Sequence, residues 1–238
     1  MYHNIRLFLK KIIKKSGYEI HRTDPSGNRF KWLQDFNINT IIDIGANVGQ
    51  FILDIRKFFP TATIYSFEPL KDVYEELIRN SLTDSNWINW ITYDVALGDF
   101  NGSTKIKRNT IATDSSLLSM AKFYKERYFF KTEEWEENIR IRRLDDLNLK
   151  LLPELMIKMD VEGFEDKVIK GGETTFKKAK VIFTEVTFQK ERYEGQILFD
   201  NLYGVLKELG FKCYGFYSVR YDPKSGAPSY ADAVFVKD

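Results

Sequence analysis

The chain has 238 residues, of which 43% are hydrophobic and 29% charged, values typical of a globular protein with one α/β domain and additions. Lys and Arg number 36 against 34 Asp and Glu, so the formal net charge of +2 gives no electrostatic argument for nucleic acid as a partner. The one cysteine, Cys213, excludes an intramolecular disulfide. The sequence shows neither a signal peptide nor an apolar run of about 20 residues, so we expect a cytoplasmic protein.

The start of the chain has the pattern of a basic amphipathic helix. Apolar residues recur there at helical spacing, and basic residues lie between them. We place this helix at residues 4–15, within an N-terminal helical extension of residues 1–37. Its apolar stripe would pack on the main domain, and the alternative is peripheral contact with a membrane surface or a partner.

An apolar run followed by small residues marks the first strand of the main domain. This run, Thr40–Ile44, predicts a strand that stops at a tight turn containing Gly45 and Gly49, where a ligand can approach the backbone. Asn47 in the same turn can cap the helix that follows. The stretch is therefore expected to form a strand, a tight turn and a helix.

A second apolar run ends at an acidic residue. The run Thr63–Phe67 is followed by Glu68 and Pro69, where a doubly wound sheet places a carboxylate that binds a ribose diol. Asn47 and Gln50 occupy positions that the dinucleotide pattern fills with glycine, so the cradle for a pyrophosphate is missing. The sequence therefore favours a nucleoside without phosphates.

The rest of the chain alternates strands with helices, which predicts an α/β fold with a mostly parallel sheet and helices on both faces. We expect a turn at residues 96–99 and a polar, irregular insertion over the site at about residues 101–137. Two last strands, joined by turn residues 222–226, predict an antiparallel C-terminal hairpin at the sheet edge. The further strands are predicted within Ile88–Val95 and at Ile139–Arg143, Leu155–Met159, Val181–Thr184, Phe211–Tyr217 and Tyr230–Val236.

Five motifs in this order resemble the FkbM family of S-adenosylmethionine-dependent methyltransferases. They are Ile-Asp-Ile-Gly-Ala-Asn-Val-Gly from residue 42, Phe-Glu-Pro from residue 67, Ala-Leu-Gly-Asp from residue 96, Leu-Asp-Asp-Leu from residue 144 and Lys-Met-Asp-Val-Glu-Gly-Phe-Glu from residue 158. Many class I methyltransferases share the first two, and the last is more specific. The resemblance implies a Rossmann-like sheet of seven strands, with a class I methyltransferase domain at residues 38–238.

The resemblance also implies which residues bind S-adenosylmethionine. Asp43, Gly45, Asn47 and Gly49 would form the turn under the methionine part, and Glu68 would bind both ribose hydroxyls. The adenine would be bordered by Pro69 and Leu70 and held by Asp94, Val95 and Ala96.

Three further acids are expected at the carboxyl ends of two neighbouring strands, the edge at which open α/β sheets bind ligands. Asp160 and Glu162 follow the strand Leu155–Met159, and Glu185 follows Val181–Thr184. Methyl transfer to oxygen needs a group that orients the acceptor and takes its proton, or a divalent cation that acidifies it. We assign Asp160 to the first role, Glu162 to shaping its position, and Glu185 to binding a metal or the substrate. Glu165 is interpreted as a helix-capping acid.

These features predict an S-adenosylmethionine-dependent O-methyltransferase that releases S-adenosylhomocysteine. By family analogy its acceptor is a small molecule or glycan, namely a sugar hydroxyl of a glycan, glycolipid or glycosylated metabolite. Two alternatives stay open, a non-catalytic nucleoside-binding or membrane-docked scaffold protein and a nicotinamide-dependent oxidoreductase. The metal requirement and the oligomeric state are not predicted.

Overall fold

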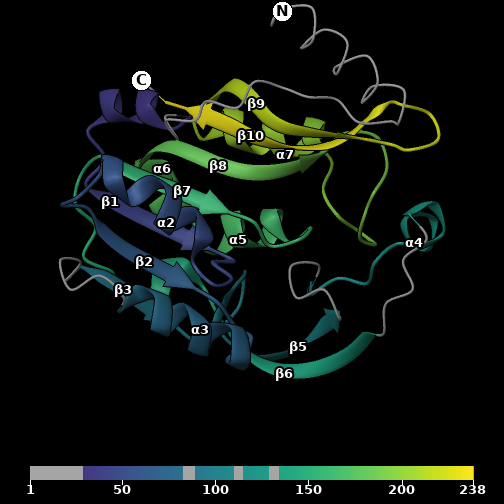
Figure 1. The fold of residues 1–238 in the computed structure, drawn as a ribbon, viewed down its shortest axis with the longest axis horizontal. Helices are drawn as coiled ribbons and strands as arrows, with labels where there is room; N and C mark the ends of the chain where they lie inside the picture. The colour runs from purple at the N-terminus through teal and green to yellow at the C-terminus, as the bar shows by residue number, and fades with distance from the viewer. Residues whose placement is uncertain (1–28, 83–88, 110–114, 129–133, 238) are drawn as a thin grey trace, which may run out of the picture. The chain divides into compact units, whose positions relative to one another are not determined.

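The structure is a computed structural model that describes residues 29–82, 89–109, 115–128 and 134–237 (Figure 1). The chain divides into two compact units, residues 1–32 and residues 33–238, and the account below concerns the second. A short 3-10 helix, η1 (Lys31–Phe36), spans the boundary. The amphipathic helix predicted at residues 4–15 lies outside the described residues. No helix in the described part of the chain is long and apolar enough to cross a membrane.

A seven-stranded sheet with the order β3-β2-β1-β7-β8-β10-β9 forms the centre of the second unit (Figure 1). The first five strands in this order are parallel, and the last two form an antiparallel hairpin, as predicted. The bounds are β1 (Thr40–Ile44), β2 (Thr63–Phe67), β3 (Trp90–Tyr93), β7 (Leu155–Met159), β8 (Ala179–Thr187), β9 (Lys212–Tyr221) and β10 (Pro228–Val236).

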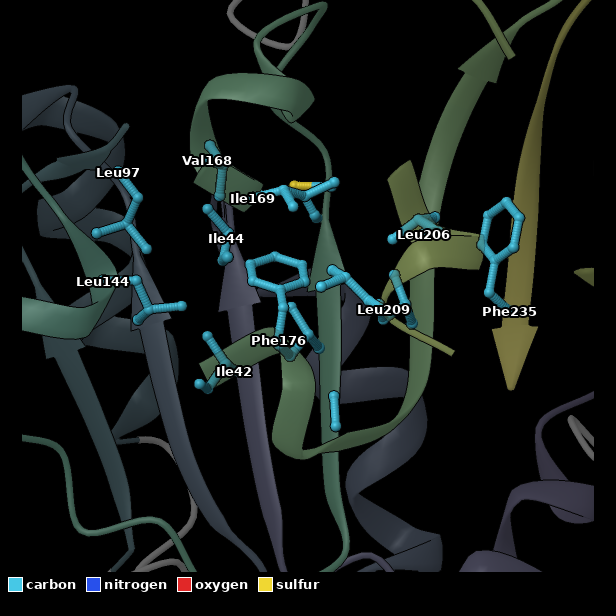
Figure 2. Close-up of a cluster of buried hydrophobic side chains, with 14 of the residues drawn as sticks. Ile42, Ile44, Leu97, Leu144, Val168, Ile169, Phe176, Leu206, Leu209 and Phe235 are labelled. Atoms are coloured by element: carbon cyan, nitrogen blue, oxygen red, sulfur yellow. The ribbon is translucent and has the colours of Figure 1, made fainter. Parts of the chain in front are cut away.

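Helices cover both faces of this sheet, also as predicted. On one face Ile42 packs in a single core with Phe176 and Leu206 of two helices (Figure 2). Ile157 and Ile182 of the neighbouring strands belong to the same core. On the other face the ring of Phe51 lies 5.7 Å from that of Phe183. The helices are α2 (Gln50–Ile55), η2 (Arg56–Phe58), α3 (Lys71–Ser81), η4 (Leu144–Asp146), α5 (Glu165–Gly171), α6 (Glu173–Lys178) and α7 (Phe199–Glu208).

The segment predicted to be irregular is largely regular, which corrects the sequence analysis. It contains β5 (Gly102–Asn109), α4 (Lys122–Tyr128) and the start of β6 (Glu134–Arg142). A three-stranded sheet with the order β4-β6-β5 results, and its third member, β4 (Ala96–Leu97), occupies the first half of the predicted turn. β5 was missed because charged residues occupy much of it, and ion pairs with β6, such as Lys105 to Glu136 at 2.7 Å, replace apolar contacts. β4 was missed because a strand of two residues is too short to show a pattern.

β8 is also longer than predicted. It continues to Thr187 because Ala231 and Tyr230 of β10 pair with its last two residues. Glu185 therefore lies within the strand, opposite Asp232, and not after its end. Glu185 still lies near the carboxyl ends of the parallel strands, as predicted.

Candidate functional site

The turn after β1 brings the ends of two neighbouring strands into contact. Gly45, Asn47 and Gly49 all have positive φ, at 69°, 50° and 86°. A Cβ atom on Gly45 would lie 1.9 Å from the backbone oxygen of Asp160, so only glycine fits between β1 and β7. The turn is thus shaped by strand packing as well as by any ligand.

The two other turn residues differ from their predicted roles in detail. A Cβ atom on Gly49 would lie 2.9 Å from Leu77 and Trp90, so this glycine faces the core. The prediction that the Asn47 side chain caps α2 is wrong. Its Oδ1 accepts a hydrogen bond from the N–H of Val48 at 2.8 Å, and Gly49 is the N-cap residue. Asn47 instead uses its left-handed backbone to turn its own N–H toward Glu68.

Glu68 directly follows β2 and is 5% exposed. Its carboxylate accepts the backbone N–H of Asn47 at 3.0 Å and that of Leu70 at 2.9 Å. Burial raises the pKa of Glu68 to about 7, although these two hydrogen bonds favour the charged form. The backbone therefore holds this carboxyl group in one position.

A pocket opens beside Glu68, at the carboxyl ends of β1, β2 and β7. Its lining includes most of the residues predicted from the sequence: Gly45, Asn47, Glu68, Pro69, Leu70, Val95, Ala96, Asp160 and Glu162. Apolar side chains missed by the sequence analysis complete the wall, namely Phe67, Leu97, Ile106, Leu117 and Phe164. The pocket thus combines one carboxyl group near the end of β2 with an apolar slot, the combination expected for a nucleoside.

Asp43, Gly49, Asp94 and Glu185 do not line this pocket. Asp94, predicted to hold the adenine amino group, accepts a hydrogen bond from the Arg140 guanidinium at 2.9 Å, and its side chain is 42% exposed. Asp43 is fully buried beneath the turn. These positions support the pocket or lie beside it.

A largely buried lysine beside the pocket was given no role in the sequence analysis. Lys158 lies in β7 with its Nζ 3.4 Å from Asp43 Oδ1 and 3.7 Å from Asp160 Oδ2, and it donates a hydrogen bond to the backbone oxygen of Gly45 at 2.8 Å. Burial alone would lower its pKa, but the two aspartates outweigh burial and raise it. Burial in turn raises the pKa of Asp43. Lys158 therefore carries a positive charge shared by two carboxylates.

The other two predicted catalytic acids meet at a buried arginine. Arg192 is 4% exposed, and its guanidinium lies 3.2 Å from Glu162 Oε2 and contacts Glu185 Oε1. The guanidinium carbon stacks 4.1 Å from the centre of the Tyr230 ring. Burial and the nearby charge of Glu162 raise the pKa of Glu185 well above its usual range. Glu185, predicted as a metal or substrate ligand, is thus paired with Arg192.

Backbone hydrogen bonds join the loop that carries Arg192 to the segment that follows the pocket residues Ser115, Ser116 and Leu117. The N–H of Ala121 donates to the Arg192 oxygen at 2.8 Å, and the N–H of Glu194 donates to the Ser119 oxygen at 2.8 Å. Ser116, which lines the pocket, donates its hydroxyl to the backbone oxygen of Glu162 at 2.6 Å. Residues 115–117 therefore form part of the pocket wall, and Ser116 ties them to the loop after β7.

Glu165 is buried at the first position of α5 and accepts the N–H of Gly163 at 3.2 Å. It is absent from the pocket lining, in agreement with its interpretation as a structural acid. Within the described ranges, no group of three or more His, Cys, Asp or Glu side chains is arranged to hold a metal ion.

Comparison with known proteins identifies the family. Residues 43–213 match the methyltransferase FkbM domain. The chain is 30% identical over 170 residues to the 2-O-methyltransferase NoeI of Sinorhizobium fredii, covering 66% of each protein, and 26% identical over 153 residues to the methyltransferase sdnD of Sordaria araneosa, covering 55% of this chain and 59% of that one. It thus spans less than two thirds of either relative.

Among solved structures, a putative S-adenosylmethionine-dependent methyltransferase from Listeria monocytogenes aligns with a TM-score of 0.49 at 9% identity, covering 90% of this chain and 99% of that one. The family match covers all the residues that line the pocket, and Arg192 beside it. The chain belongs to the FkbM methyltransferase family.

Proposed function

We propose that this protein is an S-adenosylmethionine-dependent O-methyltransferase whose acceptor is a sugar hydroxyl. The observation that carries the proposal is the buried carboxyl group of Glu68 in the wall of a pocket at the carboxyl ends of β1, β2 and β7, in a chain of the FkbM family. The name of the relative NoeI, a 2-O-methyltransferase, supports oxygen as the methylated atom. The sugar acceptor follows from the family resemblance.

The pocket residues fit the proposed methyl donor. Glu68 would accept hydrogen bonds from both ribose hydroxyls, because each of its two oxygens accepts one backbone N–H and an ionised carboxylate can accept a further bond at each. Leu70 and Val95 offer apolar contact to the adenine, and the turn at Gly45 and Asn47 would lie under the methionine part. When bound, the donor supplies a methyl group on a positively charged sulfur.

Asp160 is the best placed of the three acids to act on an acceptor. It lines the pocket and its side chain is 45% exposed, whereas Glu162 and Glu185 share the charge of Arg192. We assign to Asp160 the orientation of the acceptor hydroxyl and the removal of its proton. Glu162 and Glu185 would then act through Arg192, by holding the loop that carries Asp160.

Calorimetric titration of S-adenosylhomocysteine tests the cofactor site without knowledge of the acceptor. The wild-type protein should bind, and Glu68→Ala should weaken binding at least about tenfold because two ribose hydroxyls lose their acceptor. Asp94→Ala should change the dissociation constant less than about threefold, since Asp94 is directed toward Arg140. Glu76→Ala, an exposed change on α3, serves as the control. A wild-type protein that does not bind would refute the proposed function.

A further inference from the structure

The side chains that line the pocket carry charge of one sign. The lining contains three acidic residues, Glu68, Asp160 and Glu162, and no Lys, Arg or His among the residues that the structure describes. Such a wall disfavours an anionic ligand and favours a cationic one. The balance depends on which positive charges lie behind the wall.

Two cations with little exposure lie there, and each is shared between two carboxylates. Lys158 contacts Asp43 and Asp160. Arg192 contacts Glu162 and Glu185. Each cluster of two acids and one base therefore keeps one unit of negative charge when its acids are ionised, and Glu68 adds a further one.

The raised pKa values of these acids agree with a shortage of positive charge around them. The pKa values of Asp43, Glu68 and Glu185 are all raised, chiefly by burial, and a second carboxylate adds to the effect at each. A bound cation would reverse part of this repulsion. Because the pocket is partly screened from water, the gain exceeds that of an exposed ion pair.

We propose that this site discriminates between methyl donor and product by charge, and that Asp160 is the residue that contributes most to the difference. The inference rests on the proposed function. S-adenosylmethionine has a positive sulfur that carries the methyl group, whereas S-adenosylhomocysteine lacks that methyl group and is neutral at sulfur; the rest of the two molecules is the same. Asp160 is the acid for this role because its carboxylate is half exposed in the pocket, and Lys158 lies 3.7 Å away and is also engaged by Asp43.

Calorimetric titration of both compounds into the wild-type protein and Asp160→Asn tests the proposal. The substitution keeps the shape of the side chain and removes its charge. We expect the affinity for S-adenosylmethionine to fall about three- to tenfold, and that for S-adenosylhomocysteine to stay within about twofold. The exposed variant Glu126→Gln on α4 should change neither affinity. If Asp160 had only a structural role, the substitution would weaken the binding of both compounds equally, and that result would overturn the proposal.

Salt provides a second test on the wild-type protein, which holds even if Asp160→Asn folds poorly. Raising NaCl from about 50 to about 500 mM should weaken binding of the cationic compound more than binding of its neutral product, because screening acts on charge. Equal salt responses would overturn the proposal while leaving the cofactor site intact. Failure of both compounds to bind would refute the proposed function itself.

Discussion

The two ends of the pocket hold their carboxylates in different ways. At the end near β2, Glu68 is bound by two backbone N–H groups, from Asn47 and Leu70. At the other end, Glu162 of the pocket wall and Glu185 behind it are bound by the guanidinium of one buried arginine. Backbone donors are part of the local chain and remain after any side-chain change, whereas a shared cation can be deleted by one substitution. The second arrangement should therefore be the more fragile.

The largest effect is expected from Arg192→Met, which leaves two buried carboxylates without their counter-charge. Breaking a buried ion pair by removing one partner costs about 3 to 5 kcal/mol, and urea denaturation would measure the loss. The double variant Arg192→Met with Glu185→Gln should recover part of that stability, because one of the two uncompensated charges is gone. A double variant no more stable than the single one would show that packing against Tyr230, and not charge, dominates.

At the end of the pocket near β2, Gly45→Ala should disrupt the turn after β1 through a clash with the backbone of Asp160. The new Cβ would lie 1.9 Å from the Asp160 oxygen at a φ of 69°, so we expect a loss of about 3 kcal/mol in urea denaturation. Gly204→Ala is the matched control: Gly204 lies within α7, and a Cβ there meets nothing within 4 Å. It should gain up to about 1 kcal/mol from helix propensity. Equal stability of the two variants would contradict the close approach of β1 and β7.

A change of pH should have a smaller effect on the free energy of unfolding, and comparison with Glu68→Gln isolates the part that depends on the charge of Glu68. Its pKa is about 7 in the folded protein against a reference of 4.5, so the folded state binds a proton more tightly than the unfolded state. Its contribution to stability is therefore lost as pH rises from about 4.5 to about 7. Between pH 5.5 and 7.5 the wild-type protein should lose about 2 kcal/mol that Glu68→Gln does not lose. Parallel pH profiles in urea denaturation would contradict this ionisation.

The parallel core of the fold was predictable from the sequence. The bounds of β1, β2 and β7 agree with the predicted ones because buried parallel strands are short, continuous apolar runs bounded by turn or acidic residues. β5 could not be recognised, since Ile106 is its one buried apolar side chain and most of its pairs with β6 contain a charged residue. The bounds of β8 were too short because its last residues are strand only through pairing with β10.

The candidate site divides in the same way. The sequence by itself determined the turn after β1, the acid after β2 and the acid after β7, because each is specified by the few residues around it. Only the tertiary structure decided which acids share a cation and which of them line the pocket. Lys158 and Arg192 are unremarkable in the sequence, and they meet their carboxylates only after β1, β7 and β8 have paired. Local backbone geometry is encoded locally, whereas the compensation of buried charge depends on contacts between distant parts of the chain.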